Sequence, residues 1–142
     1  MKLAGETLWG VHSVADFATE ANDEARGFAK RYRAKYGLEP DLYSACTYGA
    51  VFLLKHAIEK AKSTDTDKVV AAMAGQKFAA PDGYEIKMDE KNHHLWKPVL
   101  IGEIQANGQF NVVWKTKGPV RAQPWSQYIA GNDKKKDEPE KK

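Results

Sequence analysis

The sequence predicts an α/β fold with three helices and a C-terminal β-hairpin. Apolar residues recur at spacings of three and four within residues 25–36, which indicates an amphipathic helix, and residues 45–54 are apolar enough for a second helix. Two stretches rich in Val, Ile, Phe and Trp flank Asn107-Gly108. Because this dipeptide tolerates the positive φ angles of a type I′ turn, the pattern predicts a hairpin.

Length and composition favour one soluble domain. The 142 residues are 42% hydrophobic and 29% charged with a net charge of +3, which allows a real core under an ordinary charged surface. No apolar run reaches about 18 residues, so no membrane span is expected. The first residues lack the apolar region of a secretory signal, so we expect none in this chain, and the single Cys46 excludes an internal disulfide.

A strand and a capped helix are expected first. Residues 7–17 form a short run of β-branched and aromatic residues, which predicts a strand followed by a loop. Asn22 suits an N-cap and Gly37 a C-cap. The apolar stripe between them consists of Ala25, Phe28, Ala29, Tyr32 and Tyr36. The basic residues on the rest of this helix are Arg26, Lys30, Arg31, Arg33 and Lys35, and we interpret them as a solvated face rather than a nucleic-acid surface.

Two further helices follow. One is expected from residue 42 to about residue 62 with Asp41 as its cap, and its first half is apolar nearly all round, which predicts burial on more than one side. Another is expected after Thr64 or Asp65, with Gly75 closing it. Its inward residues are expected to be Val69, Val70 and Met73.

Few residues suggest catalysis or metal binding. His93-His94 near Asp89 look like a metal pair, but adjacent side chains of an extended segment point to opposite faces and no closed ligand set exists. Cys46 and His56 lie about 15 Å apart along one helix, too far for a nucleophile and its base. We therefore expect no metal, no cofactor and no enzyme activity, and we interpret Cys46 as a core residue.

Short sequence motifs along the chain resemble those of one transport family. They are Tyr43-Ser44-Ala45, Tyr48-Gly49-Ala50-Val51, Asn92-His93-His94, Lys97-Pro98-Val99, Ile101-Gly102-Glu103-Ile104, Gly108-Gln109-Phe110, Val112-Val113-Trp114 and Gln123-Pro124-Trp125. In these motifs the chain is similar to the C-terminal end of the type I periplasmic solute-binding proteins of ABC importers. The similarity is closest to the urea and short-chain amide branch and next to the branched-chain amino acid branch. The resemblance implies that residues 1–130 are the C-terminal segment of such a domain, with a partial type I fold. Residues 131–142 mix both charges and are expected to form a disordered tail.

The resemblance also implies a ligand in a cleft between two lobes, a permease partner and a periplasmic full-length protein. The start of the buried helix approaches that cleft, which makes Tyr43 and Ser44 the first candidates for ligand contact. A Tyr ring and a helix N-terminus suit a planar amide or urea. The alternative is that Tyr43 only packs against the neighbouring helix. Ser13 and Asp16, near the end of the first strand, are the second candidates.

The resemblance covers only about the last third of a full-length member. A truncated or split gene and a stand-alone domain both stay open, and most ligand contacts are expected in the missing part. Four residues that the missing part would cover predict exposed apolar surface and a homo-oligomer. They are Trp9, Trp96, Trp114 and Trp125. We predict the substrate-binding component, or a fragment of it, of an ABC transporter for urea, short amides or branched-chain amino acids. The alternative is an interaction module without ligand binding, and no nucleic-acid partner is expected.

Overall fold

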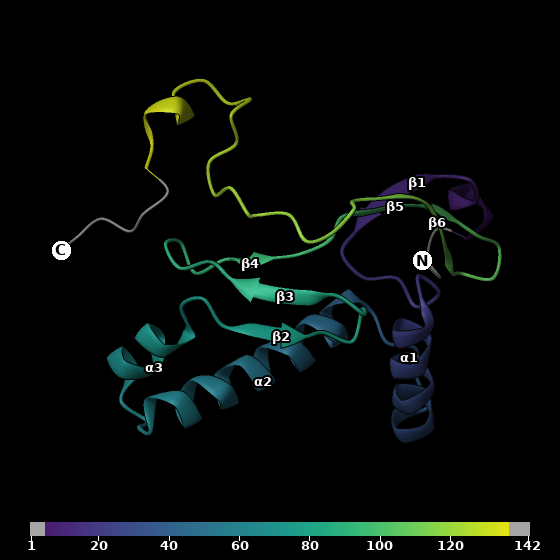
Figure 1. Cartoon of the computed structure of the whole chain (residues 1–142). Helices are drawn as coiled ribbons and strands as arrows, with labels where there is room; N and C mark the ends of the chain where they lie inside the picture. Colours follow the sequence, from purple (N-terminus) through teal and green to yellow (C-terminus); the bar gives the residue numbers. More distant parts are fainter. Residues whose placement is uncertain (1–4, 137–142) are drawn as a thin grey trace.

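The computed structural model describes residues 5–136, with side chains described from residue 7. Three helices, α1 (Asp23–Tyr36), α2 (Leu42–Ala61) and α3 (Thr66–Met73), lie beside two separate antiparallel sheets (Figure 1). The first sheet has the order β1-β5-β6, from His12–Ala15, Leu100–Ile104 and Phe110–Lys115. The second has the order β2-β3-β4, from Lys77–Ala79, Glu85–Met88 and Leu95–Trp96. Two 3₁₀-helices, η1 (Gly5–Leu8) and η2 (Asn132–Lys134), complete the elements, and the predicted α/β fold is confirmed.

α1 begins and ends where the sequence predicts. Asn22 is extended, and its side chain accepts a hydrogen bond from the Ala25 N–H at 2.8 Å. Gly37 adopts the left-handed conformation with a φ of 69°, and its N–H donates to the Arg33 carbonyl at 2.8 Å. The buried residues of α1 are Ala25, Phe28 and Ala29, which confirms the inner part of the predicted stripe.

α2 contributes a buried residue to each of the three core clusters of the described residues. Asp41 caps it by accepting from the Ser44 N–H at 2.8 Å, as predicted. Its buried residues, Ala45, Gly49, Leu53 and Ala57, are spaced four apart and form one stripe. Away from this stripe, Tyr48, Val51 and Leu54 are 41%, 61% and 46% exposed. The prediction that α2 is buried on more than one side is therefore wrong for this chain, because the described elements pack along a single stripe.

The second sheet and α3 cover the Leu53 and Ala57 part of that stripe, and α1 covers Ala45. Leu53 of α2 clusters with Ile86 and Met88 of β3. Ala57, one turn further along α2, clusters with residues of α3. These two small cores hold α3 and the sheet β2-β3-β4 on the same face of α2 (Figure 1).

α3 is shorter than its neighbours and is capped as expected. Asp65 accepts from the Lys68 N–H at 3.1 Å, and Gly75 follows the helix with a φ of 71°. Val69 is buried, but Val70 is 42% exposed, so the prediction that Val70 faces inward is wrong. Ala72 takes the inward place, because it lies three residues after Val69 and on the same side of the helix.

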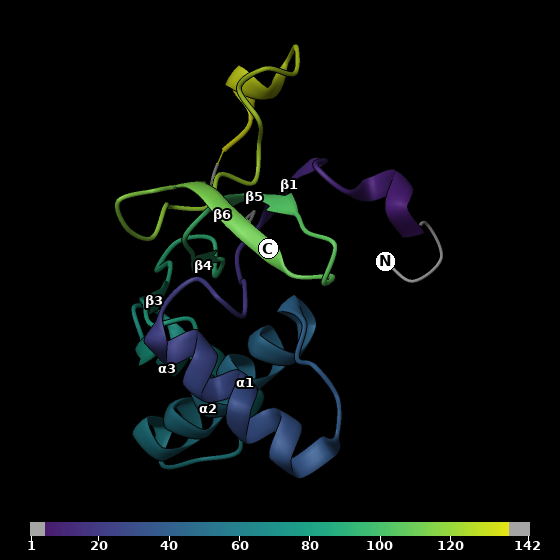
Figure 2. The same ribbon diagram turned by 90° about the vertical axis from the view of Figure 1, so that its right-hand side faces the viewer.

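β1 is shorter than the strand predicted for residues 7–17. Only His12–Ala15 is a strand, and the residues before it form η1 and a turn. β1 pairs with β5, where Val14 lies opposite Ile101. The buried residues of this sheet are Leu100 and Gly102, whereas Val14, Val113 and Trp114 are exposed. The sheet β1-β5-β6 therefore has little cover from the described part of the chain (Figure 2).

The hairpin between β5 and β6 is confirmed, but its turn is not type I′. The Gly108 N–H donates to the Gln105 carbonyl at 2.9 Å, and Gly108 has a φ of 77°. Asn107 does not have a positive φ, which a type I′ turn requires. The arrangement is instead a β-turn at residues 105–108 whose last residue, Gly108, is left-handed. The Asn107 side chain supports it by accepting from the Gln109 N–H at 2.9 Å.

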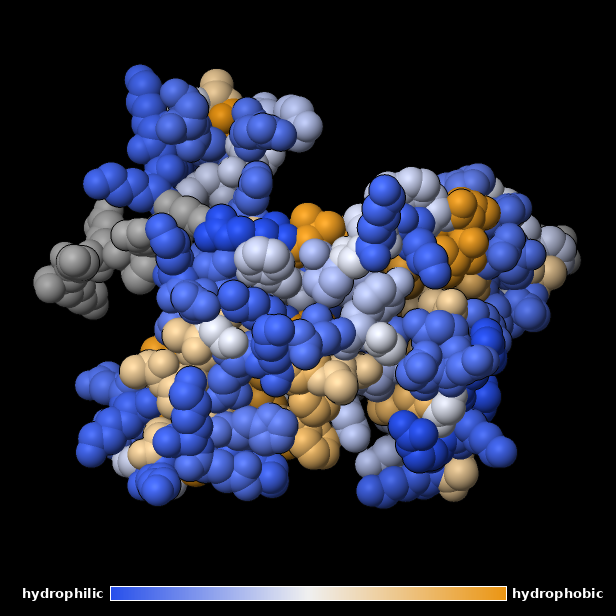
Figure 3. Space-filling view, in the orientation of Figure 1, coloured by the Kyte–Doolittle hydropathy of each residue, from blue (hydrophilic) through white to orange (hydrophobic). Residues whose placement is uncertain are grey.

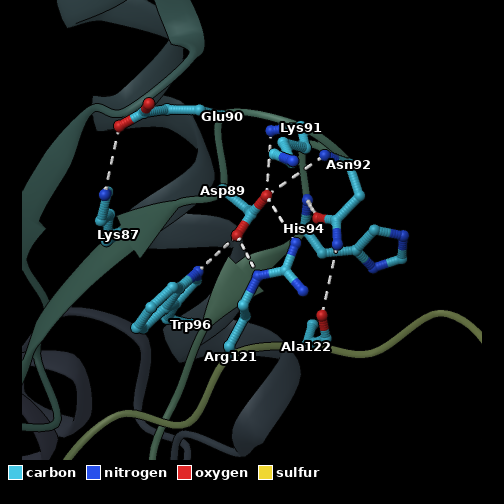
Figure 4. Close-up of polar contacts among 9 residues, drawn as sticks. All are labelled: Lys87, Asp89, Glu90, Lys91, Asn92, His94, Trp96, Arg121 and Ala122. Atoms are coloured by element: carbon cyan, nitrogen blue, oxygen red, sulfur yellow. Dashed lines mark hydrogen bonds and ion pairs between the residues drawn. The ribbon is translucent and has the colours of Figure 1, made fainter. Parts of the chain in front are cut away.

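Asp89 joins the β3–β4 turn to the C-terminal segment (Figure 4). Its carboxylate accepts hydrogen bonds from Arg121 at 2.7 and 3.2 Å and from Trp96 Nε1 at 2.9 Å. Its Oδ1 also accepts from the N–H groups of Lys91 and Asn92. The Arg121 hydrogen bond, and then these other donors, hold the pKa of Asp89 well below its usual range. This carboxylate therefore has a structural role, because it connects the β3–β4 turn to the C-terminal segment.

The segment around His93 is a turn rather than an extended stretch. His93 has a φ of 55°, and its N–H donates to the Asp89 carbonyl at 3.2 Å. The prediction that His93 and His94 alternate along an extended segment is therefore wrong. Within residues 7–136 no group of three His, Cys, Asp or Glu residues is arranged to hold a metal ion.

The C-terminal segment extends away from both sheets (Figures 1 and 2). Lys97 and Val120 form an isolated antiparallel bridge at its start, and Asn132–Lys134 form η2. Trp125 donates from Nε1 to the Lys136 carbonyl at 2.8 Å. The disorder predicted for residues 131–142 stays a prediction, and residues 137–142 lie outside the described part. In residues 5–136 no helix is long and apolar enough to cross a bilayer.

Candidate functional site

A groove with a volume of about 680 Å³ runs between α1 and the first half of α2. Its α1 side consists of Phe28, Arg31, Tyr32, Lys35 and Tyr36. Its α2 side consists of Asp41, Tyr43, Ser44, Thr47, Tyr48, Val51 and Phe52. In the space-filling view the surface is indented between these helices, with apolar residues at the indentation (Figure 3). Two of the four predicted ligand-contact residues, Tyr43 and Ser44, line this groove.

The deepest part of the groove is aromatic and hydrogen-bonded. Phe28 is buried, and its ring lies 5.5 Å from that of Tyr48 and 5.9 Å from that of Tyr32 between centroids. Ser44 Oγ donates to Asp41 Oδ1 at 2.8 Å and lies 3.3 Å from the Tyr32 hydroxyl oxygen. The two helices are thus joined at the base of the groove by ring contacts and one polar contact.

The rim of the groove is open and charged. Tyr43 is 72% exposed, so most of its side chain is accessible to a ligand. Arg31 and Lys35 come from α1, and the Lys35 ammonium lies 5.2 Å from the centre of the Tyr36 ring. Asp41 lines the groove at the start of α2, and hydrogen bonds from the Ser44 N–H and then its hydroxyl hold the pKa of Asp41 below its usual value.

A second hollow of about 390 Å³ adjoins the first and contains Ser13. It lies between β1, the turn of the β5–β6 hairpin and the start of α2, and Asp41 borders both hollows. Ser13 is exposed on β1, where its partner in β5 is Gly102. The structure therefore brings Ser13 to the same end of α2 as Tyr43 and Ser44.

Asp16 lies outside both hollows and is engaged elsewhere. Its carboxylate forms an ion pair with Lys97 Nζ at 2.6 Å, and both side chains are mostly buried. Lys97 Nζ also lies 3.2 Å from Cys46 Sγ. Burial lowers the pKa of Lys97, but its hydrogen bonds to Asp16 and Cys46 outweigh that effect, and its pKa is raised. The structure thus gives Asp16 a partner that sequence spacing does not reveal.

Cys46 is half-buried beside this ion pair, so its interpretation as a core residue is wrong. A fourth group, Asp82, is buried close to the pair, and its burial raises its pKa above the usual value. The cluster links the segment after β1, helix α2 and the segment between β4 and β5. The cluster therefore has a structural role, since its ion pair connects the two halves of the chain.

One protein family accounts for this architecture. Its model, described as a periplasmic binding protein domain, matches residues 6–131. The chain belongs to this family. Within the type I class of periplasmic binding proteins of ABC transporters, it has a partial fold with three helices and antiparallel strands. The predicted family is confirmed, whereas the urea and amide branch is not tested by this match.

Solved periplasmic binding proteins superpose on most of the chain. A leucine-binding protein from Thermotoga maritima is 29% identical, with 80% of this chain and 33% of that one covered and a TM-score of 0.69. A solute-binding protein from Rhodopseudomonas palustris BisB5, in complex with 3,4-dihydroxybenzoic acid, is 21% identical over 82% of this chain and 33% of that one, with a TM-score of 0.72. This chain therefore spans about a third of the length of these solved proteins.

A curated protein also shows similarity. It is a limonene hydroxylase from Geobacillus stearothermophilus, 34% identical over 103 residues, which are 71% of this chain and 19% of that protein. The chain spans less than a fifth of that relative.

The sequence alone does not predict two of the groove residues. Its basic pattern places Arg31 and Lys35 on a solvated face, yet both line the groove together with Tyr32 and Tyr36. The available signal is their spacing, because residues four apart on a helix share a side and each precedes a tyrosine of the apolar stripe. A basic pair next to a tyrosine pair on one side of a helix favours a groove rim over a fully solvated face.

Proposed function

We propose that this chain is the C-terminal part of the solute-binding component of an ABC importer and contributes the α1–α2 groove to its ligand site. The observation that supports this most is the convergence of Tyr43, Ser44 and Ser13 on the start of α2 in a member of the periplasmic binding protein family. An exposed tyrosine beside a capped helix N-terminus offers an apolar face and hydrogen-bonding groups to a small solute. Asp16 is part of the proposal only as a residue that fixes the adjoining segment through Lys97.

The proposed solutes are urea, short amides and branched-chain amino acids. The 29% identity with a leucine-binding protein favours the branched-chain amino acids among them. The proposed partner of the complete protein is an ABC permease, and its proposed location is the periplasm. Similarity to under a fifth of a limonene hydroxylase gives no comparable support for turnover, so we propose binding without catalysis.

We expect most of the affinity to come from the two thirds of the solved proteins' fold that this chain does not span. A two-lobed binding protein gains affinity by closing around its ligand and excluding water. In the 142-residue chain the groove is open and Tyr43 is exposed. We therefore expect millimolar binding of leucine by this chain and tighter binding once the other segments are supplied.

A fusion tests the proposal. The segment of the Thermotoga maritima leucine-binding protein that precedes the matched region is joined to this chain, and leucine, acetamide and urea are titrated by calorimetry. We expect at least one of these solutes to bind the fusion more tightly than the isolated chain. Tyr43→Ala should weaken that binding, whereas Lys30→Ala, an exposed α1 residue outside the groove, should not. Failure of the fusion to bind any of the three solutes refutes the proposed function.

One observation favours a second candidate function, an oligomerising interaction module. Val51 and Leu54 of α2 and Val14, Val113 and Trp114 of the sheet β1-β5-β6 are exposed apolar residues. Under this alternative the chain associates with copies of itself through these faces. Light scattering distinguishes the two, because an oligomer that Val51→Lys converts to a monomer supports the alternative, and a monomer of the unmodified chain refutes it.

A further inference from the structure

Cys46 and Lys97 bring a thiol and a primary amine into direct contact. Lys97 Nζ donates a hydrogen bond to Cys46 Sγ at 3.2 Å, although the two residues are 51 positions apart in the chain. Cys46 lies in the first half of α2, whereas Lys97 lies between β4 and β5. A nucleophilic sulfur and a nucleophilic nitrogen from distant segments therefore share one site.

Asp16 adds a carboxylate to this pair. Its Oδ2 forms the ion pair with Lys97 Nζ at 2.6 Å and lies 3.8 Å from Cys46 Sγ, which is placed to donate to it. A carboxylate within hydrogen-bond reach of both groups can accept the proton that either of them releases. The site thus contains a thiol, an amine and a base in contact with one another.

The backbones on both sides of the contact are fixed. The Lys97 N–H donates to the Val120 carbonyl at 3.2 Å, and the Lys97 carbonyl accepts from the Val120 N–H at 2.8 Å. Pro98, the next residue, is among the most deeply buried side chains of the described part. Cys46 follows the buried Ala45 in the middle of a helical turn. Groups held together in this way react with each other far faster than the same groups on separate molecules.

We propose that Cys46 and Lys97 form a covalent sulfur–nitrogen crosslink when hydrogen peroxide oxidises the thiol. In the first step Sγ attacks a peroxide oxygen, the O–O bond breaks, and the products are a sulfenic acid and water. In the second step Nζ gives up a proton to Asp16 and attacks the sulfur. The S–N bond forms, the S–O bond breaks, and a second water leaves. Overall the sulfur loses two electrons and the peroxide gains them.

The composition of the chain favours this product over a disulfide. Cys46 is the only cysteine among the 142 residues, so no second thiol of the chain can react with its sulfenic acid. A sulfenic acid without a thiol partner condenses with a nearby nitrogen or is oxidised further. Lys97 Nζ is the nitrogen that the structure places against the sulfur. This modification site is independent of the proposed solute-binding function.

Mass spectrometry tests the crosslink. The folded 142-residue chain is treated with hydrogen peroxide and digested with trypsin in the absence of reductant. We expect a linked pair of peptides that contain Cys46 and Lys97, with the mass of the two free peptides less two hydrogen atoms. Dithiothreitol should return the two free peptides. The chain unfolded in urea and treated in the same way should give oxidised Cys46 without the linked pair, because the two side chains are then apart.

Two lysine variants locate the nitrogen. Lys97→Arg keeps the positive charge and the N–H donors but removes the primary amine, so it should lose the linked pair while Cys46 is still oxidised. Lys55→Arg changes an exposed lysine of α2 that is paired with Glu59, and it should form the linked pair as fully as the unmodified chain. If Lys97→Arg does not fold, the comparison of the folded and the unfolded unmodified chain decides the test.

The crosslink should also stabilise the fold. It closes the segment that contains α3 and the sheet β2-β3-β4, so the urea midpoint of the crosslinked chain should rise by roughly 1 M, and dithiothreitol should reverse the rise. Oxidation of Cys46 in the folded chain without a linked pair overturns the proposal. Equal amounts of the linked pair in the folded and the urea-unfolded chain, or a linked pair that keeps an oxygen atom, also overturn it.

Discussion

Replacing Gly102 with alanine tests the closest packing in the hairpin. A Cβ atom at Gly102 would lie 2.1 Å from Cδ1 and 2.2 Å from Cε1 of the Phe110 ring, whereas carbon atoms in contact are about 3.5–4.0 Å apart. Phe110 lies opposite Ile104 and Gly102 lies opposite Val112, so the Phe110 ring reaches Gly102 diagonally across the two strands. The Gly102→Ala variant therefore forces the ring to leave its position.

The expected loss of folding free energy depends on how the clash is relieved, either by moving neighbouring groups or by exposing the Phe110 ring. Overpacking that moves neighbouring groups costs about 1–3 kcal/mol, and exposing a large side chain costs about 1.5–3 kcal/mol. Since the Phe110 ring is only half-buried, we expect Gly102→Ala to lower the free energy of unfolding by roughly 2 kcal/mol. Urea denaturation followed by tryptophan fluorescence measures this value.

Two variants make the test specific. Gly118→Ala is the control, because a Cβ there has no other atom within 4 Å, and it should change stability by less than about 0.5 kcal/mol. In a Phe110→Ala background the Gly102→Ala change should cost clearly less than in the unmodified chain, as a double-mutant cycle reports. The packing argument is refuted if Gly102→Ala costs no more than Gly118→Ala.

Two further predictions concern the hydrogen bonds of Asp89 and the hairpin turn at Gly108. Because the pKa of Asp89 is lowered in the folded state, its contribution to stability is present above the unfolded pKa of about 3.9 and is lost as the pH falls toward the folded value. Asp89→Asn should therefore show a smaller loss of urea stability between about pH 4 and pH 2 than the unmodified chain, and an equal loss contradicts the assigned role. Gly108→Val should lower the free energy of unfolding by roughly 1–2 kcal/mol, because a β-branched residue is strained at a φ of 77°, and an unchanged melting temperature contradicts this reading.

Local sequence signals predicted the helices well. Asn22, Asp41 and Asp65 each accept a hydrogen bond from an N–H three residues later, a contact that depends on only a few neighbouring residues. The hairpin was predicted for the same reason, although its turn type was not. Asn107-Gly108 is compatible with more than one turn, and the pairing of β5 with β6 decides between them.

Contacts between distant residues were not predictable in this way. Arg121 binds Asp89 across 32 residues, and Lys97 binds Asp16 across 81, so no spacing rule connects either pair. The exposure of one side of α2 was not predicted either. An apolar sequence predicts burial, but it does not show which other segments of a fold cover the helix. The family resemblance predicts two of the groove residues, Tyr43 and Ser44. It does not predict the basic residues at the rim, Arg31 and Lys35.

Along the single stripe of α2, the described residues form three small clusters rather than one core. Ala45, Leu53 and Ala57 each belong to a different cluster, so α2 is the only helix of the described part that is present in all three. The sheet β1-β5-β6 contributes no residue to any of them. Slow amide hydrogen exchange should therefore be concentrated in α2, while the strands of that sheet exchange through local opening at lower free energy.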